Sequence, residues 1–159
     1  MSAPILEFDI DPVWGETIDW EALANRAAEA TARIVPELAH ENLLISLVMA
    51  DDEEVHALNK QWRAKDKPTN VLSFPMMHPD DMPGMPEILL GDIVLALGVC
   101  TREAEEKAVP MPVHASHLIV HGVLHLLGYD HMAEEEATAM EAIERLAMAD
   151  LGLPDPYQD

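Results

Sequence analysis

Residues 43–62, LLISLVMADDEEVHALNKQW, join a strand pattern directly to a helix pattern. Over residues 43–49 a strongly apolar side chain recurs at every second position, and this alternation predicts a buried strand. The acidic pair Asp51–Asp52 follows and favours the start of a helix, whose apolar face includes Val55 and Leu58. A strand that leads straight into an amphipathic helix indicates a fold that packs helices on a sheet.

The same two patterns recur along the rest of the chain. Further strands are expected at Ile5–Ile10, Asn70–Phe74 and Ile88–Leu97. Further helices are expected from the N-cap Asp19 to Pro36, over Thr101–Lys107, over Val113–Leu127 and over Glu134–Leu151. The proline-rich stretch Pro75–Pro86 is expected to be a loop. These elements predict one α+β domain over residues 1–159, with a sheet of about four strands and about five helices.

Composition excludes several classes of protein. Apolar residues make up 49% of the 159 residues, enough for a core without disulfides, and the single cysteine, Cys100, excludes a thiolate-rich metal site. No apolar stretch approaches the roughly 20 residues of a membrane span. The first basic residue is Arg26, so the N-terminus lacks the basic region of a signal peptide. We therefore expect a soluble cytoplasmic protein with no membrane partner.

The net charge of −21 argues against a general nucleic-acid-binding surface, and no DNA partner is expected. The basic residues are unevenly distributed, however. Lys60, Arg63, Lys65 and Lys67 place four of the nine basic residues in one short segment. Because salt limits repulsion to about 10 Å, a local basic patch can contact phosphates on an acidic protein. Taken alone, the segment is better explained as a solvated helix face and turn, and the histidine motif described below shifts the interpretation toward phosphate contact.

The stretch HGVLHLLGYDH, from His121 to His131, carries the strongest functional signal. His121 and His125 are four residues apart, so they lie one turn apart on the same face of a helix. Gly128 is expected to end that helix, which lets His131 approach from outside it. Three neutral imidazoles leave a fourth coordination position for water, as in a catalytic zinc site. The sequence therefore predicts a metal site, with the metal at the end of a helix in the C-terminal half.

The same spacing matches part of the metallopeptidase pattern HExxHxxGxxH. In that pattern the residue after the first histidine is a glutamate that serves as general base. Here the position is Gly122, which has no side chain to take a proton. A metzincin-like peptidase is therefore the second hypothesis, behind other metal-dependent hydrolases.

Other polar residues near this stretch have two interpretations each. His114 and His117 share roughly the same helix face as His121, and they either support the site or are ordinary polar positions beside a wet cleft. Asp130 either orients an imidazole or is a simple turn aspartate. Asp92 interrupts an apolar strand, where a carboxylate needs a partner or a cleft.

The histidine stretch, together with RAKDKPTNVLSFP at 63–75 and LGDI at 90–93, resembles the YbeY family of bacterial endoribonucleases, also described as rRNA maturation factors. The resemblance covers about Leu43 to Tyr157 and is weak over the first forty residues. It implies that His121, His125 and His131 are the metal ligands. It also implies that Arg63 matches a functionally important arginine of the family.

The resemblance further implies a metal-dependent endoribonuclease that is specific for single strands. Such an enzyme would mature the 3′ end of small-subunit (16S) ribosomal RNA and act in ribosome quality control. Its expected partners are single-stranded ribosomal RNA, the small ribosomal subunit and ribosome-associated proteins. Its expected cofactor is one zinc ion per chain, although imidazole ligands also suit other transition metals.

Catalysis is expected to involve the metal site, including His121, and Arg63. An arginine can hold a phosphate bidentately and stabilise the charge that develops on it. The attacking group is either a metal-activated water or the 2′-OH of the RNA itself. A third, non-enzymatic hypothesis is a ribosome-assembly factor in which the metal is only structural.

Overall fold

The computed structural model describes residues 4–38, 43–63, 70–76, 88–129 and 134–157, without the side chains of residues 62 and 63. The strands are β1 (Ile5–Ile10), β2 (Leu43–Ala50), β3 (Val71–Pro75) and β4 (Ile88–Ala96). The helices are α1 (Trp20–Ile34), α2 (Asp52–Arg63), α3 (Leu97–Glu106), α4 (Met111–Leu126) and α5 (Glu134–Asp150). Short 3-10 helices lie at Pro12–Trp14 and Pro36–Leu38. These elements confirm the predicted α+β fold class.

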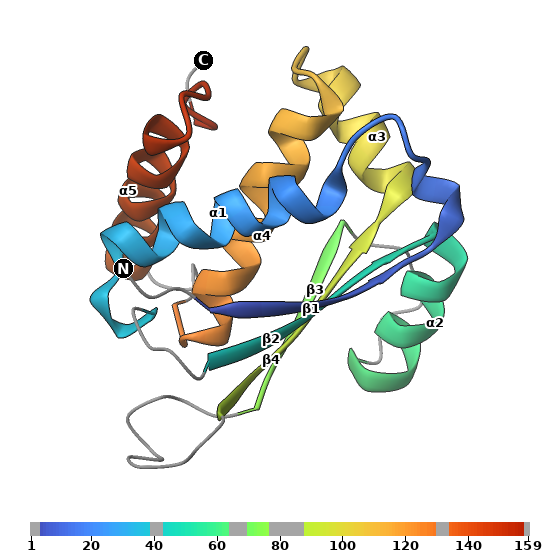
Figure 1. Ribbon diagram of the computed structural model, residues 1–159, viewed down its shortest axis with the longest axis horizontal. Coiled ribbons are helices and arrows are strands. Elements are labelled where there is room, and N and C mark those ends of the chain that lie inside the picture. The colour runs from blue at the N-terminus through green and yellow to red at the C-terminus, as the bar shows by residue number, and fades with distance from the viewer. Residues whose placement is uncertain (1–3, 39–42, 64–69, 77–87, 130–133, 158–159) are drawn as a thin grey trace.

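The four strands form one mixed sheet in the order β1-β2-β4-β3. β1, β2 and β4 are parallel, and β3 pairs antiparallel with β4 at one edge. Helices α1, α4 and α5 lie on one face of the sheet, and α2 covers the other (Figure 1). Two apolar clusters follow from this layering, a large one under α1, α4 and α5 and a small one under α2.

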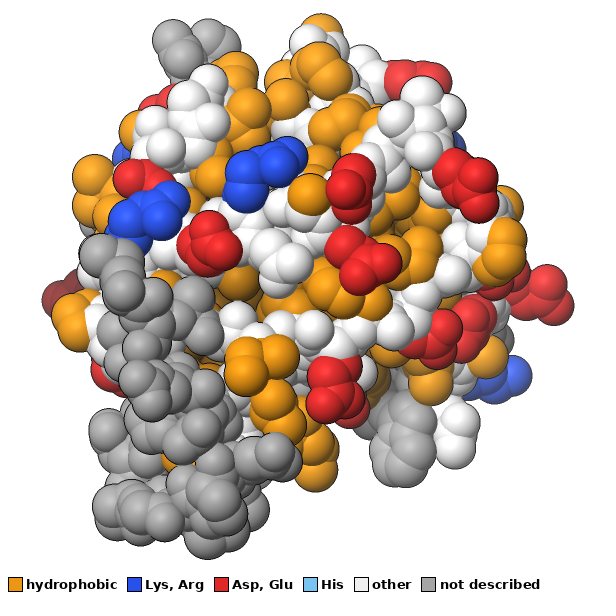
Figure 2. All heavy atoms as spheres, in the orientation of Figure 1, with side chains coloured by type: hydrophobic (Ala, Val, Ile, Leu, Met, Phe, Trp, Pro, Cys, Tyr) orange, Lys and Arg blue, Asp and Glu red, His pale blue; other side chains and the backbone are white. Residues whose placement is uncertain are grey.

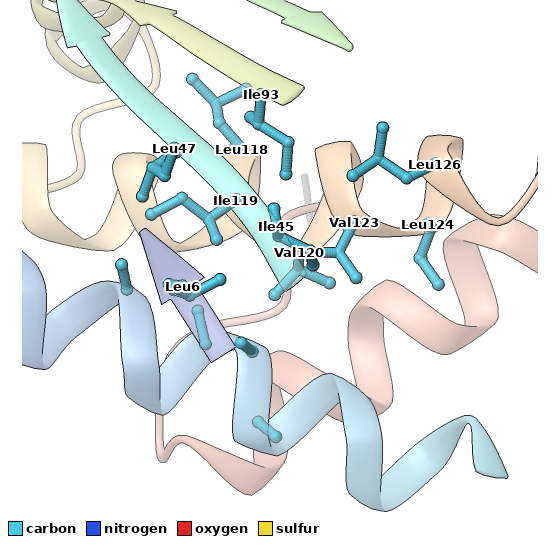
Figure 3. Close-up of a cluster of buried hydrophobic side chains, with 14 of the residues drawn as sticks. Leu6, Ile45, Leu47, Ile93, Leu118, Ile119, Val120, Val123, Leu124 and Leu126 are labelled. Carbon is cyan, nitrogen blue, oxygen red and sulfur yellow. The ribbon is translucent and has the colours of Figure 1, made fainter. Parts of the chain in front are cut away.

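Helix α4 lies at the centre of the large cluster. Its side chains, including Ile119 and Val123, pack toward Ile45 and Leu47 of β2 and toward Ile93 of β4 (Figure 3). All five of these side chains are at most 1% exposed. The alternation predicted for residues 43–49 is confirmed, because the side chains at odd positions are the fully buried ones. The sheet therefore fixes the position of α4 along one whole side.

A bulge in β4 brings three elements into close contact. The pairing of β2 with β4 shifts register after Leu44, and Gly91 lies there with φ +154°. A Cβ at Gly91 would come within 2.4 Å of the Phe74 carbonyl oxygen and within 2.6 Å of Leu126 Cδ2. Only glycine fits this point, where β3, β4 and the last turn of α4 meet.

Helix α3 begins four residues earlier than the sequence predicted, immediately after β4. Its N-cap residue, Ala96, provides no side-chain hydrogen bond. Instead Asp52, from the first turn of α2, accepts a hydrogen bond from the Val99 N–H at 3.0 Å. Gly98 leaves room for that carboxylate, since a Cβ there would lie 2.3 Å from Asp52 Oδ2. The cap comes from a distant part of the chain, so local sequence does not reveal it.

Helix α4 ends just before Gly128, the residue that was predicted to end it. Gly128 has φ +97°, and its N–H bonds to the His125 carbonyl at 3.0 Å. The Tyr129 N–H bonds to the Leu124 carbonyl at 3.1 Å. This pair of bonds is the Schellman arrangement, which turns the chain away from the helix directly after His125.

On the face shown in Figure 2, acidic side chains are scattered among apolar and neutral ones, and basic side chains show mainly at the upper left. Within the described ranges, none of the helices combines the length and apolar character that crossing a bilayer requires.

Two neighbouring leucines of β4 test this packing. Leu90 is 0% exposed and Leu89 is 38% exposed. Leu90→Ala should lower the free energy of unfolding by about 2–5 kcal/mol, because it leaves a cavity in the core. Leu89→Ala, the matched control, should lower it by less than about 1 kcal/mol. Urea unfolding followed by circular dichroism measures both, and equal losses would contradict the assigned orientation of β4.

Candidate metal centre

Four histidines follow one side of α4 at spacings of three and four residues: His114, His117, His121 and His125. This spacing keeps all four on one face of the helix. His114 is 3% exposed and His117 is 7% exposed, whereas the side chain of His121 is 20% exposed. The row therefore runs from the interior toward solvent as it approaches the C-terminal end of α4.

A buried carboxylate from α5 joins the middle of this row. Glu144 is 0% exposed, and its Oε1 lies 2.7 Å from His121 Nδ1 and 3.0 Å from His117 Nε2. Its Oε2 accepts a hydrogen bond from the Tyr157 hydroxyl at 2.6 Å. Burial by itself would raise the pKa of Glu144, but the hydrogen bonds from His117, His121 and Tyr157 outweigh it and lower the pKa to about 2. Glu144 is therefore ionised at neutral pH.

The hydroxyl of Tyr157 keeps its proton, because burial and its hydrogen bond both raise its pKa. Burial raises the pKa of Tyr157, and the hydrogen bond to the charged Glu144 raises it further. The tyrosine is thus a fixed donor to the carboxylate.

The charge on Glu144 selects the tautomer of His121. A carboxylate only accepts hydrogen bonds, so His121 Nδ1 carries the ring proton and donates it in a hydrogen bond to Glu144, which places the ring lone pair on Nε2. His125 Nε2 lies 3.0 Å from His121 Nε2, and the two ring centroids are 4.5 Å apart. Two imidazoles on one tetrahedral zinc, with Zn–N of about 2.0–2.1 Å, have nitrogens about 3.3 Å apart. Two of the three predicted ligands therefore fit a shared ion, and the third, His131, lies outside the described residues.

A second grouping of ligand atoms overlaps the first. His117, His121 and Glu144 each offer an atom within 4.8 Å of the others, so this group could also hold a metal ion. An ion there would be enclosed, because Glu144 and His117 are both buried. The pair His121–His125 lies at the more exposed end of the row. Only an exposed site leaves a position for water or substrate.

His114 continues the pattern with a different partner. Its Nε2 lies 2.9 Å from Glu103 Oε1, which also accepts from the Asn70 side chain at 2.9 Å. Burial lowers the pKa of His114 although Glu103 acts in the opposite direction. Both His114 and His117 are therefore buried and bonded to carboxylates, which favours a supporting role over that of ordinary polar positions. Both border a cavity of about 390 Å³.

The remaining predicted residues are only partly described. Arg63 is the last residue of α2, on the other face of the sheet from α4, and its side chain lies outside the described part of the structure. Lys60 is exposed on the same helix, and Asp92 is half-buried on β4. Several other predicted residues fall outside the described ranges: Lys65, Lys67, Asp130 and the loop residues from 77 to 86.

Sequence reasoning missed Glu144 and Tyr157. A signal for Glu144 was present, because it shares the buried stripe of α5 with Met140, Ala147 and Met148. A glutamate at such a position needs a partner in the core. The neighbouring histidine row of α4 could have been proposed as that partner. No comparable signal marks Tyr157, which lies beyond the last helix.

The fold has a solved counterpart. The solution structure of a Thermotoga maritima protein superposes with a TM-score of 0.58 over 98% of this chain and 100% of that one. The two sequences are 22% identical, so the likeness concerns the fold alone.

Sequence comparison identifies the family. The family model described as Endoribonuclease YbeY matches residues 12–152. A protein of that name from Novosphingobium aromaticivorans is 64% identical, covering 99% of this chain and 98% of its own length. Another from Rhizorhabdus wittichii is 54% identical over 92% of each. This protein, with its histidine row and its α+β fold, belongs to the YbeY family.

Proposed function

We propose that this protein is a metal-dependent endoribonuclease that cuts single-stranded RNA, with the ion held by His121, His125 and His131. The main support is the 3.0 Å separation of the Nε2 atoms of His121 and His125, with the other nitrogen of His121 held by Glu144. Membership of a family whose compared members are named endoribonucleases supports RNA as the substrate.

The chain's own residues then have distinct roles. A bound transition metal supplies Lewis acidity at the phosphate or at an attacking water. Glu144 holds the His121 ring in one tautomer and one orientation, and His117 shares that carboxylate. Arg63 would contact the scissile phosphate and stabilise the charge that develops during cleavage. Lys60, exposed on the same helix, would add to the local attraction for the RNA backbone.

The cellular role follows from the family resemblance. We propose that the chain acts as one domain over residues 1–159, in the cytoplasm, with one zinc ion or another transition metal. Its substrate would be ribosomal RNA at the 3′ end of the small-subunit species, in maturation and quality control. Its partners would be the small ribosomal subunit and proteins associated with it.

The packing of Gly122 disfavours the peptidase alternative. A Cβ at this position would lie 3.0 Å from Ile93 Cγ2, on the side of α4 that packs on the sheet. A glutamate here would enter the core next to β4, whereas His117 and His121 contact α5. The general base of the peptidase pattern therefore has no place in this packing. An assembly factor with a structural metal is the other alternative, and catalytic assays separate it from the proposal.

Single-histidine variants distinguish the two groupings of ligand atoms. Purified wild type should hold about one zinc ion per chain, and His125→Ala should lose most of it, because a three-histidine site loses a ligand. His117→Ala, the matched control, should keep more metal, since it removes only a neighbour of Glu144. Metal content by mass spectrometry after dialysis measures both. Zinc retained in His125→Ala and lost in His117→Ala would favour the enclosed group of His117, His121 and Glu144.

Arg63→Ala should reduce cleavage of single-stranded RNA by about 100- to 1000-fold, as expected for loss of a group that stabilises transition-state charge. Its zinc content should stay unchanged. Arg63→Lys should restore only part of the activity, because a lysine cannot bind phosphate bidentately.

Arg26→Ala, at an exposed position of α1, is the control for loss of a positive charge. Cleavage that persists in both Arg63→Ala and His121→Ala would point to a contaminating nuclease. In the wild type, products ending in a 2′,3′-cyclic phosphate would assign the attack to the RNA 2′-OH.

Gly122→Glu tests the peptidase alternative. The variant completes the peptidase pattern, yet it should show no peptide hydrolysis and should lose about 3 kcal/mol or more of stability, because a carboxylate enters an apolar core. Ala142→Glu, at an exposed position of α5, should leave stability nearly unchanged. Chelator-sensitive cleavage of an unstructured peptide by Gly122→Glu would contradict this account.

A further inference from the structure

The C-terminal segment after α5 folds back onto that helix. The backbone N–H of Tyr157 donates to Asp155 Oδ1 at 2.8 Å, and the same oxygen accepts from Arg145 Nε at 3.3 Å. The Arg145 guanidinium lies 5.5 Å from the centre of the Tyr157 ring. These contacts hold the tyrosine against α5 with its hydroxyl directed inward.

The hydroxyl of Tyr157 reaches the buried carboxylate behind the candidate metal site. It donates to Glu144 Oε2 at 2.6 Å, while its ring packs edge-on against His117 with centroids 5.5 Å apart. The two histidines share the other oxygen, Oε1. Within the described part of the chain, the Tyr157 hydroxyl is the donor to Oε2, so it fixes how the carboxylate plane is turned.

The orientation of that plane determines how well His121 is held. The 2.7 Å bond from His121 Nδ1 requires Oε1 to stay where it is. Without the tyrosine hydroxyl, Oε2 of this fully buried charge would lose the donor that the described residues supply, which favours rotation of the carboxylate toward other donors. His121 would then lose part of the contact that fixes its tautomer and its ring.

We infer that Tyr157 is a positioning residue for the metal site, acting through Glu144 on His121. The C-terminal tail thereby becomes part of the site although it contributes no ligand. This inference rests on the proposed binding of metal by His121 and His125.

Zinc affinity, measured by competition with a chromophoric chelator, tests the inference. Tyr157→Phe should weaken zinc binding about 10- to 100-fold, the usual effect of losing an outer hydrogen-bond partner of a ligand. In a Glu144→Gln background, where the charge is gone, adding Tyr157→Phe should have little further effect. Such a double-mutant cycle isolates the coupling between the two residues.

A stability control separates positioning from folding. Val55→Ala lies in the small cluster under α2, on the opposite face of the sheet, and it should lower the melting temperature of the apo protein while leaving zinc affinity unchanged. Tyr157→Phe with wild-type zinc affinity, or with the same loss in both backgrounds, would overturn the inference alone. A wild-type protein that binds no zinc would overturn the proposed metal site as well.

Discussion

The carboxylate of Glu144 is a full negative charge placed in the interior of the protein, and the site is arranged around it. An unpaired buried charge costs several kcal/mol, so the fold must supply donors on every side. It does so with His117 and His121 from α4 and with Tyr157 from the C-terminal tail. Three separate parts of the chain are thereby fixed relative to one another. This arrangement holds the ring of His121, and His121 lies next to His125 at the more exposed end of the row.

Helix α4 connects this polar cluster with the apolar core. One side of the helix packs on the sheet through residues such as Ile119 and Val123, and His117 and His121 contact Glu144 of α5. A helix that is buried on most sides has little freedom to rotate or slide. Gly122 and Gly91 allow the backbone of α4 to lie close to β4. The imidazole nitrogens are therefore positioned by the core as much as by their own hydrogen bonds.

The parts of this structure that depend on local pattern could be predicted from the sequence. The first strand was predicted with its observed ends, Ile5–Ile10, and Gly128 marked the end of α4 because a positive φ suits glycine. The closeness of His121 and His125 follows from helical periodicity alone. The start of α3 and the role of Glu144 depend instead on which elements pack together. Asp52 and Glu144 act on residues 47 and 23 positions away, a relation that periodicity does not encode.

The proposed ligands bear on how so acidic a chain would bind RNA. With a net charge of −21, the protein repels a polyanion at long range, but screening confines that repulsion to about 10 Å. Within that distance, the charge close to the site determines whether the RNA backbone is attracted or repelled. A divalent ion bound by three neutral imidazoles keeps its whole charge, whereas carboxylate or thiolate ligands would cancel it. Glu144, which contacts the Nδ1 side of His121, would offset only part of that charge. The proposed set of three histidine ligands would thus place a positive centre on a chain whose net charge is strongly negative.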